Sequence, residues 1–225
     1  MGRKLLALGT LVITLAVSAV AAASGWSPNS TDEAVHAHTA SAGSPSAVKL
    51  RLKLATLFQE HTTLALVATQ KGLEGSKGFA ASAKGLDANS VAIANAIGSV
   101  YGSKVRNQFL NGKFLWRDHI RFFVDYTVAT AKKDKVAQDK AVNNLLAYVG
   151  AFSKFLADAT GLPQKALAHG ITAHVLGLKA SVDAYAAGDH AKAFAELRKA
   201  NVHMVMTGDT LADAIAKKFP HKFAK

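Results

Sequence analysis

The sequence contains no cysteine, 4 prolines and few glutamates, which are Glu33, Glu60, Glu74 and Glu196. The absence of cysteine excludes disulfide bonds, iron–sulfur clusters, covalently attached c-type haem, thiolate zinc sites and a cysteine nucleophile. The scarcity of glutamate excludes a ferritin-like di-iron site, which needs four inward glutamates and two Glu-x-x-His pairs. None of the three glutamates after residue 47 begins such a pair. Imidazole, with thioether as a possible addition, is therefore the metal ligand that the sequence can supply.

Common catalytic signatures are also missing. The chain has no Gly-rich phosphate loop, no Gly-x-Ser-x-Gly motif and no His-Glu-x-x-His motif. An enzyme is therefore the weakest of the functional classes that we consider. It is left open only because a histidine-bound metal with a free coordination position can support hydrolytic or redox chemistry.

The N-terminal residues have the pattern of a targeting segment. Arg3 and Lys4 precede an apolar and small-residue run over residues 5–23, which ends in three alanines. This pattern is typical of a secretory signal peptide, with an uncleaved N-terminal membrane anchor as the alternative. Residues 24–47 contain mostly Ser, Thr, Ala, Gly, Asn and Pro, and are expected to be a disordered linker. We expect an exported protein, either secreted or associated with the cell envelope.

Positive charge is in excess, with 27 Lys and Arg against 15 Asp and Glu, a formal charge of +12. Removing residues 1–23 leaves 25 against 15, or +10. This excess would suit a basic structural or interaction protein that docks to anionic cell-envelope polymers or a membrane surface. Nucleic acid is not expected as a partner, because the chain is exported and has no recognition-helix motif.

From Val48 to Lys225 the chain has the apolar periodicity of amphipathic helices, for example at Leu50, Leu54, Leu57 and Phe58. Turn residues interrupt this pattern at 72–77, 101–103, 132–135, 161–163 and 188–189. The predicted fold is all-α, a single domain of six antiparallel helices of about 22–30 residues. Because the layout recurs at 55–58-residue spacing around His61, His119 and His174, we interpret it as three helical hairpins in an up-and-down bundle, or as a four-helix bundle with an appended pair.

Four histidines are expected at one depth of this bundle. His61, His119 and His174 each lie among apolar residues three and four positions away, and His203 lies at the border of an apolar stripe. Each is 13–15 residues from the turn of its hairpin, so the four can share one layer. A single buried histidine is usually a core residue with one hydrogen bond. Four at one level favour a shared ligand, because imidazole binds zinc, copper, nickel and haem iron.

Copper is the favoured ion, followed by zinc or nickel, since Met204 and Met206 beside His203 offer additional thioether ligands. The role would be storage, buffering or delivery of the ion. Haem held by two opposed histidines is the alternative. Asp125, Tyr126 and Tyr148 are candidates for second-shell partners that fix the imidazole tautomers.

A family resemblance is carried by several short segments spread between Leu54 and Phe223. They are residues 58–61, 116–119, 122–127, 188–189 and 203–204. In these segments the chain resembles poorly characterised secreted bacterial helical-bundle proteins that often carry a copper-amine-oxidase-like label. The resemblance implies a metal site at the four histidines and specifies no reaction.

Overall fold

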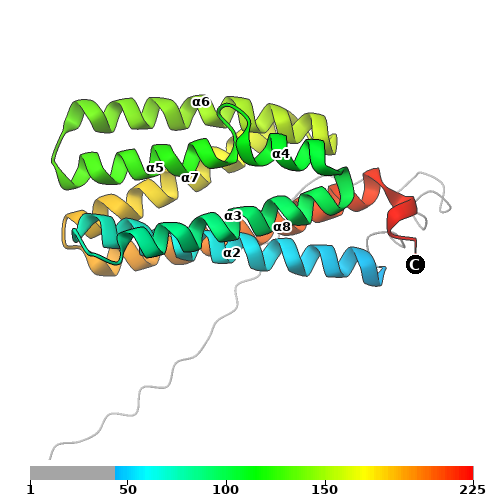
Figure 1. Cartoon of the computed structure of the whole chain (residues 1–225), viewed down its shortest axis with the longest axis horizontal. Helices are drawn as coiled ribbons and strands as arrows, with labels where there is room; N and C mark the ends of the chain where they lie inside the picture. Colours follow the sequence, from blue (N-terminus) through cyan, green and yellow to red (C-terminus); the bar gives the residue numbers. More distant parts are fainter. Residues whose placement is uncertain (1–43, 225) are drawn as a thin grey trace, which may run out of the picture. The chain divides into compact units, whose positions relative to one another are not determined.

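The computed structural model describes residues 44–224, which lie within one compact unit. The predicted signal peptide or anchor, and all but the last residues of the predicted linker, lie outside the described residues. The described elements are helical, which confirms the all-α prediction (Figure 1). They are α2 (Pro45–Leu73), α3 (Phe79–Tyr101), α4 (Ser103–Asn111), α5 (Trp116–Ala131), α6 (Lys135–Thr160), α7 (Gln164–Ala186), α8 (His190–Lys218) and the short 3-10 helix η1 (Pro220–Lys222).

Short polar side chains determine where several helices begin. The Ser44 hydroxyl accepts a hydrogen bond from the Ala47 amide, and Pro45 occupies the first turn of α2, so the helix begins three residues before the expected boundary. Asp134 and Asp189 cap α6 and α8 in the same way. All five turns expected from the sequence separate helices in the structure.

One further interruption was not expected. The predicted third helix is divided into α4 and α5 at residues 112–115. Gly112 is extended, and a Cβ atom there would lie 2.6 Å from the Gln108 carbonyl oxygen. Phe114 adopts a left-handed conformation with φ of 55°, and its amide donates to the Asp118 carboxylate at 2.7 Å. The interruption starts a new helix at Trp116, three residues before His119.

Helix α2 lies at the centre of the packing, because it contacts α3, α5, α7 and α8. The consecutive pairs α2–α3, α5–α6 and α7–α8 also pack against each other (Figure 1), while the internal sequence repeat stays a prediction.

The crossing of α2 and α8 is close enough to require glycine. A Cβ atom at Gly208 would lie 2.7 Å from the Ala55 amide nitrogen and 2.8 Å from its Cα atom. No helix within residues 44–224 is both long and apolar enough to cross a membrane.

Candidate metal centre

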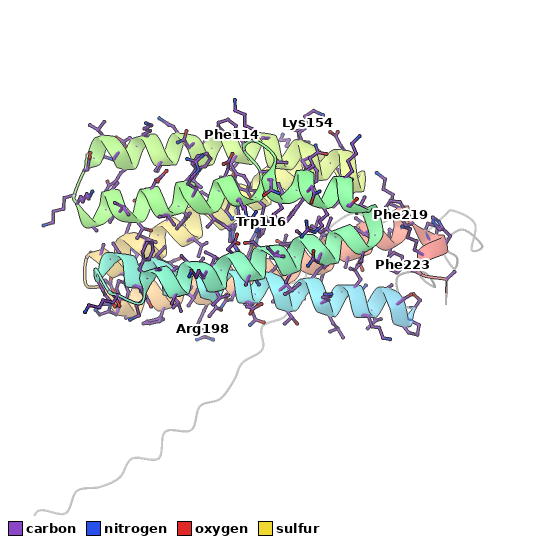
Figure 2. All side chains as sticks on the ribbon, in the orientation of Figure 1. Phe114, Trp116, Lys154, Arg198, Phe219 and Phe223 are labelled. Atoms are coloured by element: carbon purple, nitrogen blue, oxygen red, sulfur yellow. The ribbon has the colours of Figure 1, made fainter. Side chains whose placement is uncertain are left out.

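Three of the four predicted histidines meet in the middle of the bundle. His61 lies on α2, His119 on the first turns of α5, and His174 on α7. These helices contact one another in all three pairings, so the site occupies the point where α2, α5 and α7 meet. Trp116, which packs on two of the histidines, lies near the middle of the bundle (Figure 2). We call His61, His119 and His174 the histidine triad.

The spacing of the triad suits metal coordination. One ring nitrogen from each histidine can be chosen so that all three atoms lie within 4.8 Å of one another. The Nε2 atoms of His61 and His119 are 3.4 Å apart. Metal–imidazole bonds of 2.0–2.1 Å at a tetrahedral angle place two ligand nitrogens about 3.3–3.4 Å apart. The His61–His119 pair already has this separation, and small side-chain movements would bring His174 to it.

All three rings are removed from solvent, with exposed fractions of 1% for His61, 3% for His119 and 6% for His174. Burial is the main reason that the pKa of each ring lies below its ordinary value of 6.5. The pKa of His119 falls to about 3, with a smaller contribution from the charge of His174 and an opposing one from the Trp116 carbonyl. The pKa of His174 falls to about 4, with a contribution from the charge of His203. The triad is therefore neutral at pH 7, as metal binding requires.

The triad has unsatisfied hydrogen-bonding capacity. The Nδ1 atoms of His61, His119 and His174 are buried, and none has a hydrogen-bond partner within residues 44–224. The Nε1 atom of Trp116 is also buried and has no hydrogen-bond partner among these residues. An unpartnered buried polar group costs about 1–3 kcal/mol, so natural proteins rarely keep several together. The Nε2 atoms of His61 and His119 lie within hydrogen-bond distance of each other, so the unused capacity of the triad lies at the three Nδ1 atoms. A bound ion would satisfy ring nitrogens that have at most one another as partners.

The surroundings of the triad are aromatic and apolar. The Trp116 ring lies 4.8 Å from that of His61 and 4.7 Å from that of His119, measured between ring centroids. Tyr148 stacks on His119 with 4.7 Å between the ring centroids, and burial raises the pKa of Tyr148 well above its ordinary value. A small cavity of about 20 Å³ borders His61 and His119. This volume holds one water-sized group, so the haem alternative finds no support among the described residues.

His203 lies outside the triad. Its ring is half-buried, and its Nε2 atom is 3.0 Å from the Gly170 carbonyl oxygen, one turn before His174 on α7. Met204 is buried in the core of the bundle, whereas Met206 is 62% exposed. The structure therefore brings together three of the four histidines, and it places His203 and Met206 in the lining of a separate hollow.

Two of the predicted second-shell residues have partners other than histidine. The exposed Asp125 carboxylate lies 3.9 Å from Arg121 on the same helix. The Tyr126 hydroxyl donates a hydrogen bond of 2.5 Å to Asp183. Tyr148, the third of these residues, contacts the triad through its ring face.

Trp116 was not among the site residues predicted from the sequence. The signal was present, because Trp116 precedes His119 by three residues and the two share one face of a helix. Its indole ring contacts both His61 and His119, so it fixes the relative orientation of two triad members.

Comparison of the chain with protein-family models, with curated proteins and with solved structures found no match in any of the three.

Proposed function

We propose that the histidine triad binds one copper ion and that the protein stores, buffers or delivers this ion. The observation that supports the proposal is the convergence of three buried imidazoles, with ligand atoms within 4.8 Å of one another and no hydrogen-bond partner at their Nδ1 atoms within residues 44–224. Imidazole is a common ligand for copper, zinc and nickel, and three of them form a trigonal or an incomplete tetrahedral site.

The lack of anionic groups favours copper in its monovalent form. Among residues 44–224, no carboxylate belongs to the group of convergent ligands, and the cavity beside the triad is lined by uncharged residues in addition to His61 and His119. Moving an ion from water into an apolar interior costs free energy that rises with the square of its charge. Three neutral imidazoles therefore hold Cu(I) at a lower cost than Zn(II) or Ni(II), which follow in the expected order.

Burial of the triad favours holding an ion over turnover. A catalytic metal needs a coordination position that a substrate can reach. The triad rings are at most 6% exposed, and the cavity beside them has room for one water-sized group. This arrangement suits an ion that is protected from solvent, and it supports storage, buffering or delivery.

The test is a titration of the metal-free protein, produced without a histidine tag, with Cu(I) in the presence of a chromophoric competitor. We expect one ion per chain, and X-ray absorption should show three nitrogen ligands at about 2.0 Å. The His61→Ala, His119→Ala and His174→Ala variants should each lose this site. His169→Ala, at an exposed position on α7, is the matched control and should bind as the parent does.

Two results would refute the proposal. One is a parent protein that takes up no stoichiometric copper, zinc or nickel. The other is a variant without the three triad imidazoles that binds copper as tightly as the parent. A parallel titration with Zn(II) and Ni(II) ranks the three ions, and the expected order is copper first.

Export of the protein is a separate proposal that rests on residues 1–23. N-terminal sequencing of the protein from the culture medium and from the envelope fraction should find a mature chain that begins at about residue 24. A start at Met1 in the envelope fraction would instead support the N-terminal anchor. Release from the envelope by about 0.5 M salt would support docking to anionic polymers.

A further inference from the structure

A surface hollow lies beside the triad, between α7 and α8. It has a volume of about 260 Å³, and the turn between α6 and α7 contributes to its lining. Its lining is mainly apolar and includes Leu162, Leu167 and Ile171. His203 and Met206 are the lining residues with nitrogen and sulfur atoms able to bind a soft metal ion.

The hydrogen bond of His203 prepares its ring for a ligand. A carbonyl oxygen only accepts, so Nε2 of His203 carries the hydrogen that it donates to Gly170 at 3.0 Å. In the neutral ring the lone pair is then on Nδ1. Histidines that bind metals commonly donate their other N–H to a backbone carbonyl in this manner.

Met206 supplies a second donor on the same face of α8. It is three residues after His203, a spacing that places two side chains next to each other on a helix. Its side chain is 62% exposed, whereas Met204 is 4% exposed. The two threonines of the hollow on α8, Thr207 and Thr210, donate their hydroxyl hydrogens to the carbonyls of His203 and Met206, each at 2.9 Å.

The hollow and the triad share helix α7, because Gly170 lines the hollow and His174 belongs to the triad. Gly170, which accepts the hydrogen bond from His203, is one turn before His174 on α7. The His203 ring lies close to the α7 backbone, and a Cβ atom at Gly170 would be in ordinary van der Waals contact with Nε2 at 3.9 Å. The charge of His203 also acts on the ring of His174, the most exposed member of the triad.

We propose that His203 and Met206 form an outer binding site for a soft monovalent ion, Cu(I), through which the ion enters the triad. This inference rests on the proposed function, because it supplies a route to a triad whose rings are at most 6% exposed. An ion that moves through an apolar wall needs a new ligand before it leaves the old one. The nitrogen and sulfur donors of the hollow provide that ligand next to His174.

The outer site is tested by methyl NMR of the full chain carrying labelled methionine, with Ag(I) as a redox-inert substitute for Cu(I). The chain has 3 methionines, so the Met206 methyl signal is identified by its loss in Met206→Leu. In a variant that lacks the three triad imidazoles, we expect Ag(I) to shift the Met206 methyl signal and to leave that of buried Met204 unchanged. His203→Phe should weaken this response by about 10–100-fold.

The entry role is tested by the rate of Cu(I) uptake. We expect Met206→Leu and His203→Phe to slow the loading of the triad by about tenfold or more, while the final content stays at one ion per chain. Val202→Ala, at a position on α8 that is 63% exposed and outside the hollow, should load at the parent rate. Thermal unfolding followed by circular dichroism shows that each variant is folded.

The outcomes separate this inference from the proposed function. An Ag(I) titration that leaves the Met206 methyl signal in place overturns the outer site. Loading of Met206→Leu and His203→Phe at the parent rate overturns the entry role. A parent protein whose triad takes up no copper refutes the proposed function and with it the entry role, and the Met206 signal then decides the outer site alone.

Discussion

Mild acid should destabilise the metal-free protein, because the triad is buried in its neutral form. The pKa of His119 is about 3 and that of His174 about 4 in the folded state, against 6.5 for an exposed ring. Below pH 6.5 the unfolded chain binds protons at these positions and the folded chain does not. The free energy of unfolding is therefore at its full value above pH 6.5 and falls as the pH decreases.

The size of the effect follows from the two pKa values. At pH 5, 1.5 units below the unfolded value, each of these rings lowers the free energy of unfolding by about 2 kcal/mol. His119 and His174 together remove about 4 kcal/mol, and His61 acts in the same direction because its pKa also lies well below 6.5. Domains of this kind are stable by about 5–15 kcal/mol, so the loss is a large fraction of the total.

The assay is urea unfolding at pH 7, 6 and 5, followed by circular dichroism at 222 nm in the presence of a chelator. Among the acidic residues, Glu74 has a pKa below 4.5, set mainly by its hydrogen bond from Tyr185, and it loses its contribution only at lower pH.

Two variants define the comparison. His119→Phe combined with His174→Leu removes two of the titrating rings. The slope of the free energy of unfolding against pH should then decrease, by the equivalent of about two fewer protons taken up on unfolding. His169→Gln, at an exposed position, should retain the dependence of the parent. A free energy of unfolding that is constant between pH 7 and pH 5, or that increases in acid, would show that the triad is not neutral and buried as described.

Other substitutions test the packing and the caps. Gly208→Ala forces α2 and α8 apart and should lower the free energy of unfolding by about 1–3 kcal/mol, measured by urea unfolding. At Gly150 an added Cβ atom meets no atom within 4 Å, so Gly150→Ala should raise the free energy of unfolding by about 0.5–1 kcal/mol. The reverse order would contradict the close crossing. Asp134→Ala removes the hydrogen bond that the Asp134 side chain accepts from the Ala137 amide, and it should lower the free energy of unfolding by about 1 kcal/mol. The measurement is a fall in melting temperature. An unchanged melting temperature would mean that the cap does not contribute to stability.

Most of the fold follows from periodicity and turn residues. The five expected turns contain glycine, proline or short polar residues, and Gly161 and Gly188 indeed adopt positive φ at two helix ends. The break between α4 and α5 was missed although Asn111-Gly112 is a turn signal. The apolar period continues across it, through Leu110, Leu115 and Trp116, and local pattern cannot show that the backbone turns.

The sequence predicts the level of each histidine along the bundle better than the side of the helix from which its ring projects. Counting residues from the turns places His119 level with Tyr148, and the two rings are stacked in the structure. The same count places His203 level with His174, and His203 does lie against α7. It contacts the backbone at Gly170 and stays outside the triad, because the rotation of α8 about its axis depends on its packing against α2. Helix rotation is a property of tertiary contacts that a single sequence does not encode locally.

The origin of the triad on three helices has a consequence for when the protein can hold its ion. His61 and His119 are separated by 58 residues, and His174 follows on a third helix, so the ligands meet only after most of the bundle has closed. Partly synthesised or cleaved chains lack a complete set of ligands. An ion bound only by the closed bundle slows its opening and adds about 4 kcal/mol of stability when present at 1,000 times its dissociation constant. A chain that crosses a membrane unfolded would arrive without copper and would acquire it only where it folds.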